Sequence, residues 1–166
     1  MKWFKFTSLF LAAGAFTLLD TSLFANMTVK NASIVSVFQL IIILALVADT
    51  RNYFIFVSGA IIFFAVFSSL PVWTIFILLF LLPCSVLYLR KGHLPLPSLP
   101  VATIILLLSN LIFELVLLLY IKEWNKKGFE VMYYFVLINT VFGSLIYYFF
   151  HLYLHIKTRG GKIKNF

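Results

Sequence analysis

The sequence predicts an all-α integral membrane protein, a bundle of six transmembrane helices joined by short loops. Hydrophobic residues make up 63% of the 166 residues, and charged residues make up only 11%. The apolar residues gather in six long runs, and a helix that crosses a bilayer needs about 20 such residues. A bilayer offers no water to backbone groups, and the runs lack the polar–apolar alternation of barrel strands, so we expect each run to be a helix.

The first three predicted spans cover residues 3–24, 33–48 and 53–69. The first follows a basic start and has some features of a signal peptide. Its length and the presence of Asp20 near its end favour a helix that is retained in the mature protein. The second span is short and ends at the polar stretch 49–52.

The last three predicted spans cover residues 71–89, 101–121 and 129–156. Pro71 suits the first position of a helix, where its missing N–H would be unpaired in any case. The proline-rich stretch 94–100 cannot be helical, and residues 122–128 form a charged turn. Residues 1–156 are therefore expected to form one domain, followed by a basic and disordered tail, 157–166.

The net charge of +8 would suggest nucleic acid as a partner of a soluble protein, but here the basic residues lie at the ends of apolar runs. If the N-terminus is cytoplasmic, the inner segments carry Lys2, Lys5, Arg51, Arg90, Lys91, Lys157, Arg159, Lys162 and Lys164. The outer segments then carry only Lys30, Lys122, Lys126 and Lys127. The positive-inside rule predicts a multi-pass protein of the plasma or inner membrane with both termini inside, and the tail would face anionic lipid.

The sequence holds one cysteine, which excludes an internal disulfide and a site built from several cysteines. Cys84 follows Pro83 inside an apolar run, which is typical of a small buried packing residue. Nothing resembles a nucleophile elbow, a phosphate loop or a zinc-protease helix. We therefore expect no catalytic residues, no metal and no cofactor.

His151 and His155 are four residues apart near the inner end of the last span, so they share one helix face. That spacing is able to hold a metal ion, but no nearby carboxylate or cysteine supplies a third ligand. Tyr147, Tyr148 and Tyr153 surround the pair, a pattern that favours an interfacial belt of amphipathic side chains.

Glu114 is the only acidic residue deep inside a predicted span. An ionised carboxylate at that depth costs several kcal/mol, so the side chain should face the bundle interior. Asn110 lies one turn earlier on the same face. Two interpretations stay open: a ligand or proton site, or a neutral Glu114 that hydrogen-bonds Asn110 and a neighbouring helix.

Gln39 in the second span and Asn139 in the sixth are uncharged polar residues at comparable depth. Hydrogen bonds between membrane helices are worth about 0.6–2 kcal/mol each, and we expect both residues to stabilise helix packing. Asp20 and Asp49 lie at the predicted membrane edges, where we expect them to be solvated.

The third span ends in a turn that consists of Phe67, Ser68, Ser69, Leu70 and Pro71. This turn, the preceding helix with Gly59 and the layout of six short spans resemble MreD, the small membrane subunit of the bacterial rod-shape system. The family typically has a "D-x-F-S-S-x-P-x-G"-like turn. Here Ala65 and Trp73 stand where that pattern has Asp and Gly.

The resemblance implies a non-catalytic scaffold whose partners are an MreC-like membrane protein, cell-wall synthases and a cytoplasmic actin-like filament. The same size and span count also describe the substrate-binding membrane subunit of an energy-coupling vitamin transporter. Such a subunit should have an outward-facing pocket with convergent polar groups. An integral membrane enzyme is a third interpretation and should show a cluster of His or Asp at one membrane face.

Overall fold

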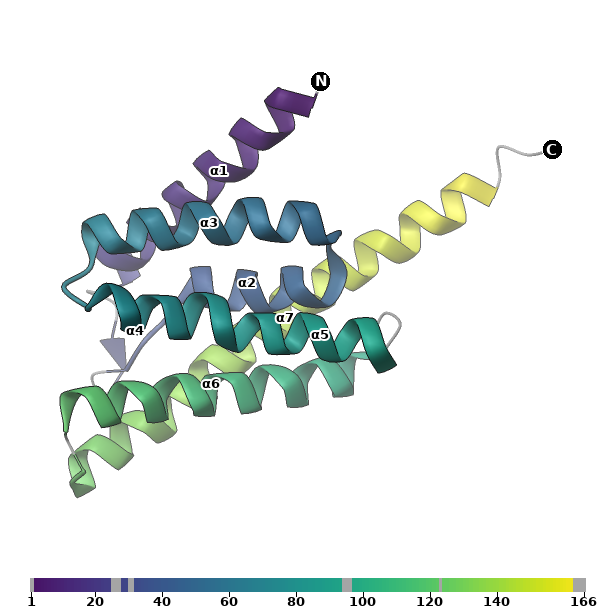
Figure 1. The fold of residues 1–166 in the computed structure, drawn as a ribbon. Helices are drawn as coiled ribbons and strands as arrows, with labels where there is room; N and C mark the ends of the chain where they lie inside the picture. Colours follow the sequence, from purple (N-terminus) through teal and green to yellow (C-terminus); the bar gives the residue numbers. More distant parts are fainter. Residues whose placement is uncertain (1, 25–27, 30–31, 94–96, 123, 163–166) are drawn as a thin grey trace.

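Helices lie side by side along most of the chain and form an elongated bundle (Figure 1). The computed structural model describes residues 2–24, 28–29, 32–93, 97–122 and 124–162. In chain order the elements are α1 (Lys2–Leu18), the π-helical turn η1 (Leu19–Phe24), β1 (Thr28–Val29), β2 (Ala32–Ser33), α2 (Ser36–Val47), α3 (Thr50–Phe67), α4 (Val72–Phe76), the π-helical turn η2 (Ile77–Leu81), α5 (Leu82–His93), α6 (Leu99–Ile121) and α7 (Lys126–Lys162). The predicted all-α class is confirmed, with one short antiparallel hairpin of β1 and β2 added.

Four helices are long and apolar enough to cross a membrane, and they cover Thr50–Phe67, Val72–Arg90, Leu99–Ile121 and Lys126–Leu154. Two further apolar helices are shorter and cover Phe6–Ser22 and Ser36–Val47. They correspond to the first two predicted spans, so the predicted number of six membrane crossings stays a prediction.

The second predicted span begins too early, because α2 begins at Ser36 and not at residue 33. The preceding residues pair with β1, with Thr28 opposite Ser33 and Val29 opposite Ala32. Backbone that is already hydrogen-bonded in a hairpin cannot also form the first helical turn. The segment 32–35, here called the lead-in segment, is therefore extended or irregular.

The last helix is longer than the predicted span 129–156, because α7 runs from Lys126 to Lys162. Asn125 begins it, and its side-chain oxygen accepts the N–H of Gly128 at 2.8 Å, as a helix cap does. Residues 157–162 of the tail, for which we expected disorder, continue α7, since an established helix gains one hydrogen bond for each residue it adds. Residues 163–166 lie outside the described part of the chain.

α4, η2 and α5 follow one another as a single helical run from Val72 to Arg90. Pro83 lies inside this run and has no N–H for the carbonyl four residues earlier, which its ring also crowds. The π-helical turn of η2 immediately precedes Leu82 and Pro83 and widens the backbone at this point. The helix thereby accommodates a proline without ending.

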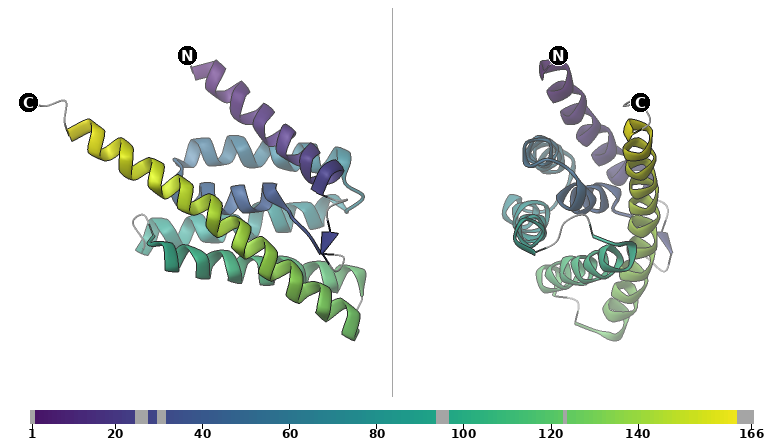
Figure 2. Two further views of the ribbon diagram at one scale, coloured as in Figure 1. Left: turned by 180° about the vertical axis from the view of Figure 1, so that it is seen from behind. Right: turned by 90° about the vertical axis from the view of Figure 1, so that its right-hand side faces the viewer.

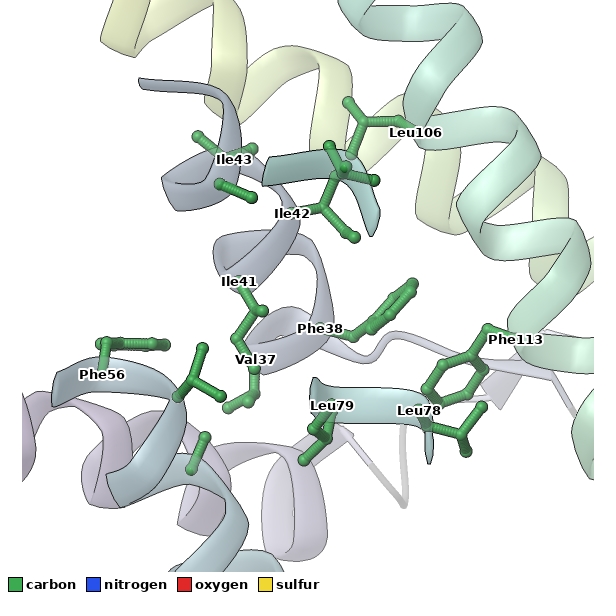
Figure 3. Close-up of a cluster of buried hydrophobic side chains, with 14 of the residues drawn as sticks. Val37, Phe38, Ile41, Ile42, Ile43, Phe56, Leu78, Leu79, Leu106 and Phe113 are labelled. Carbon is green, nitrogen blue, oxygen red and sulfur yellow. The ribbon is translucent and has the colours of Figure 1, made fainter. Parts of the chain in front are cut away.

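α2 lies in the centre of the bundle with other helices around it (Figure 2). Nine of its residues are buried, so it is apolar on nearly every side. Its side chains point toward α3, the η2 region and α6, where they meet Phe56, Leu78 and Phe113 (Figure 3). Because α2 fills the core, the neighbouring helices pack their buried side chains against it.

α1 packs closely against α3 through small residues. A Cβ added at Gly59 would lie 3.1 Å from Ala13 Cβ and 3.3 Å from the Phe10 carbonyl oxygen. On the facing helix, a Cβ at Gly14 would lie 2.6 Å from the Phe63 ring. The two helix backbones approach closely because these two positions carry no side chain.

Replacing Gly59 with Val is therefore expected to destabilise the protein by about 1–3 kcal/mol, since the added methyls meet backbone of α1 that cannot move aside. Thermal denaturation in detergent, followed by circular dichroism, measures the effect as a lower midpoint. Ala65→Val on the exposed side of α3 is the matched control and should change the midpoint little. Equal midpoints for both variants would contradict the close packing of α1 on α3.

Candidate functional site

The start of α2 is held by a carboxylate from another helix. Asp20, in η1, accepts the backbone N–H of Ser36 at 2.9 Å and that of Val37 at 2.8 Å, and it accepts the Ser36 hydroxyl at 2.5 Å. The first N–H groups of a helix have no partner inside the helix, and the helix dipole favours a negative charge there. Asp20 is 7% exposed, so the expectation that it is solvated is wrong. Asp49 is exposed as expected.

Asn139 of α7 holds the lead-in segment just before α2. Its side-chain oxygen accepts the Val35 N–H at 2.8 Å, and its amide donates to the Ser33 carbonyl at 2.9 Å and to the Phe135 carbonyl at 3.0 Å. Buried backbone outside regular structure needs partners of this kind. Asn139 is fully buried and joins two segments, which agrees with its predicted role in packing.

The other end of α2 is held by a cation. Arg90, near the end of α5, donates to the carbonyls of Ala45 at 3.2 Å and Ala48 at 2.7 Å. The last carbonyls of a helix are unpaired, and the helix dipole favours a positive charge at this end. α2 thus has an acidic residue at its start and a basic residue at its end, each supplied by a different helix.

A second set of buried polar contacts joins α2, α6 and α7. Gln39 donates to the Asn110 side-chain oxygen at 2.6 Å, and the Asn110 amide donates to the Thr140 hydroxyl at 3.2 Å. Gly143 makes room for this contact, because a Cβ there would lie 2.6 Å from the Gln39 side-chain oxygen. The role that we expected for Gln39 in helix packing corresponds to these bonds, whereas Asn110 was expected to bind Glu114.

Glu114 does not share in these contacts. It is 6% exposed, but the side chain of Asn110 is used by Gln39 and Thr140, so the predicted bond between Glu114 and Asn110 is not formed. Within the part of the chain that the structure describes, no residue forms a hydrogen bond or ion pair with the Glu114 carboxyl group. The side chain instead borders a cavity.

This cavity has a volume of about 330 Å³ and lies at the hairpin end of the bundle. Its wall comes from η1, the lead-in segment, α3, the turn after α3, α6 and α7. Asp20 and Glu114 are its acidic residues, and aromatic and aliphatic side chains supply most of the rest, among them Phe113 and Phe135. The size is that of a small-ligand site.

The family-like residues lie at the end of α3 and in the loop between α3 and α4. α3 ends at Phe67, and the Ser68 hydroxyl oxygen accepts the Leu70 N–H at 3.1 Å. The Pro71 carbonyl accepts the N–H groups of residues 74 and 75 and so begins α4. Leu70 also lines the cavity, while Ser69 is exposed.

Tyr147 does not belong to the predicted interfacial belt. It is fully buried, and its hydroxyl donates to the Pro97 carbonyl before α6. A buried tyrosine packs its ring and needs a partner for its hydroxyl, and the loop backbone supplies one. Tyr148 and Tyr153 are exposed. The ring of His151 lies 6.0 Å from that of Tyr147, and the side chain of His155 lies outside the described residues.

Cys84 is partly buried, and the Tyr53 hydroxyl donates to its sulfur at 3.7 Å. Among the described residues, no three His, Cys, Asp or Glu side chains are placed so that they could hold a metal ion. Comparison of the sequence with protein-family models and with curated proteins found no match, and neither did comparison with solved structures. The site is therefore interpreted from its own geometry.

The sequence did not predict that two charged residues bind the ends of α2. Asp20 and Arg90 stand at the ends of apolar runs, where charged residues are usually solvated. One feature of the sequence could have indicated these roles. The second apolar run is shorter than its neighbours, so the ends of its helix are expected to lie inside the bundle and to need polar partners. Only the fold reveals which charged side chains reach them.

Replacing Asp20 with Ala is expected to lower the free energy of unfolding by about 2–4 kcal/mol, because buried N–H groups of α2 lose their charged acceptor. Asp49→Ala is the matched control, since Asp49 precedes α3 but is exposed and makes no side-chain cap bond. Unfolding in detergent with increasing denaturant measures both. A loss of stability as large for Asp49→Ala as for Asp20→Ala would contradict the capping role.

Proposed function

We propose that this chain is an integral membrane protein with six membrane-crossing segments. We further propose that it is a non-catalytic scaffold subunit of the bacterial rod-shape, cell-wall elongation machinery. The observation that carries the proposal is the distribution of side chains, with polar groups inside and large apolar groups outside. The resemblance to MreD supplies the biological setting.

The outer surface of the bundle is rich in large apolar side chains along α3, α6 and α7. Ile62, Ile104 and Val141 are each more than half exposed, whereas Gln39, Asn110 and Asn139 are completely buried. Water would favour the reverse arrangement, and lipid favours this one because its chains accept apolar side chains at no cost. The distribution supports a position in the bilayer.

α2 is short, but together with the segment before it, it is long enough to count among the six proposed crossings. Its 12 residues rise only about 18 Å, but the extended lead-in segment before it adds about 13 Å. The sum is close to the hydrocarbon thickness of about 30 Å. Irregular backbone is tolerated at such depth where protein covers it and satisfies its hydrogen bonds, and Asn139 does so here for Ser33 and Val35.

The arrangement of the loops supports a topology with both termini on the cytoplasmic side. α1 begins and α7 ends toward the end of the bundle opposite the hairpin (Figure 2). Arg90 lies at that same end, where it binds the end of α2. The turn between α6 and α7, with Lys122 and Lys126, lies at the hairpin end.

Reporter fusions test this topology. Fusions at Arg51 and after the last residue are expected on the cytoplasmic side, and a fusion at Lys126 on the outer side, because the more numerous basic residues stay inside. An enzymatic reporter that is active on only one side of the membrane gives the measurement. Placement of the Lys126 and C-terminal fusions on the same side would contradict six crossings.

The scaffold role is supported by two helix segments that reach beyond the bundle (Figure 1). On α1, Phe4 is 81% exposed and Leu11 is 60% exposed. On the last part of α7, Phe149 and Tyr153 are also mostly exposed. Helices of an MreC-like protein or of a cell-wall synthase are proposed to pack on these segments, and the basic tail is proposed to bind anionic lipid.

A second candidate function is the substrate-binding membrane subunit of an energy-coupling vitamin transporter. The cavity at the hairpin end favours it, because that end is the outer one in the proposed topology and two carboxyl groups border the cavity. The surface features of α1 and α7 do not distinguish the two candidates, since a transporter subunit also needs a membrane partner.

When the protein is depleted, the cells that make it are expected to become rounder or wider, because the cell-wall synthases lose the scaffold that holds them together. Cell width measured by phase-contrast microscopy gives the readout, and re-expression of the native chain should restore the rod. Purification from native membranes should recover cell-wall synthesis proteins. Normal shape, together with lost uptake of one vitamin and recovery of an ATPase module, would replace the scaffold by the transporter subunit.

A further inference from the structure

The cavity at the hairpin end contains two carboxyl groups in different states of hydrogen bonding. Both oxygens of Asp20 are used, since one accepts from Ser36 and the other from Val37. Glu114 is buried to more than nine-tenths, and none of the described residues binds its carboxyl group. Asp20 is thus part of the framework of α2, whereas Glu114 is available to a ligand.

Burying an ionised carboxylate without a partner costs free energy, and a cation within hydrogen-bond distance offsets that cost. The Lys residues nearest along the chain are exposed on the turn after α6, such as Lys122 and Lys126, and neither forms an ion pair with Glu114. A positive group on Glu114 therefore has to come from outside the described residues, because none of them pairs with its carboxyl group.

The other walls of the cavity restrict the chemistry of that group. Phe113 and Phe135 stack with ring centroids 5.5 Å apart, and both rings border the cavity. Leu117, Ile121 and Val131 add aliphatic surface. Aromatic faces attract an ammonium group within about 6 Å, and the aliphatic walls favour an apolar body attached to it. A bare metal ion would find too few oxygen ligands here.

We propose that the cavity between η1, the lead-in segment, α6 and α7 binds a ligand with an ammonium group on a small apolar body, with the ammonium group on Glu114. The volume of about 330 Å³ accommodates such a molecule. A free amine and the head group of an aminophospholipid share this chemistry. The inference does not depend on the scaffold role, since either candidate function permits a ligand at this position.

The test uses the full-length protein in nanodiscs of phosphatidylglycerol, which has no ammonium group, with 2-phenylethylamine as the probe and calorimetry as the measurement. Saturable binding is expected beyond that of empty discs. Glu114→Gln keeps the size and hydrogen-bonding capacity of the side chain but not its charge, and it should weaken binding by about tenfold or more. The neutral analogue 2-phenylethanol should bind the native protein more weakly by a similar factor.

Glu130→Gln is the matched control, because Glu130 is an exposed carboxylate near the same end of the bundle and does not border the cavity. Its affinity for the probe should equal that of the native protein. Val131→Phe fills the cavity without changing any charge and should weaken binding as Glu114→Gln does. Thermal denaturation without ligand shows that each variant is folded.

Discs that also contain phosphatidylethanolamine distinguish the two sources of the ligand. Weaker binding of the probe in these discs assigns the site to a lipid head group, and unchanged binding assigns it to a free amine. The proposal is overturned if 2-phenylethanol binds as tightly as 2-phenylethylamine. Full affinity in folded Glu114→Gln would overturn it as well. Either result leaves the scaffold role to be judged by cell shape alone.

Discussion

α2 begins inside the protein, and the need to satisfy its first backbone N–H groups is the constraint on which the rest of the structure depends. A buried donor without a partner costs about 1–3 kcal/mol, and the first turn of a helix has several. Asp20 of η1 supplies acceptors for these N–H groups, Asn139 of α7 binds Val35 just before the helix, and Arg90 of α5 supplies donors at the other end. These three contacts connect α2 and the segment before it to η1, α7 and α5.

The contacts along α2 also set the relative positions of α6 and α7. Gln39 reaches Asn110, Asn110 reaches Thr140, and Gly143 leaves the space in which they meet. In the proposed bilayer setting, apolar contacts are similar for many arrangements of the helices, because lipid is as apolar as leucine. Buried hydrogen bonds are directional, so they select one arrangement among these.

The two carboxyl groups at the hairpin end differ in their hydrogen bonding. Asp20 and Glu114 border the same cavity and are similarly buried, yet their surroundings differ. Both carboxylate oxygens of Asp20 accept hydrogen bonds from the start of α2, whereas Glu114 borders the largely apolar cavity wall. Exposed apolar side chains on α1 and α7 meanwhile offer contact surfaces elsewhere on the bundle. The proposed partner-binding surfaces and the proposed ligand site therefore lie on different parts of this small protein.

The apolar runs by themselves determined the helical class, the approximate limits of α3 to α7 and the inward position of the polar residues in the middle of the runs, because hydrophobicity and proline act locally. The late start of α2 and the partners of Asp20, Gln39 and Asn139 were decided only by the tertiary structure. Those hydrogen bonds join residues 16, 71 and 104 positions apart. The tertiary structure also decided that none of the described residues binds the Glu114 carboxyl group, since Asn110, its neighbour on α6, contacts other helices. No local pattern records such contacts, because they arise only when the packed helices bring distant segments together.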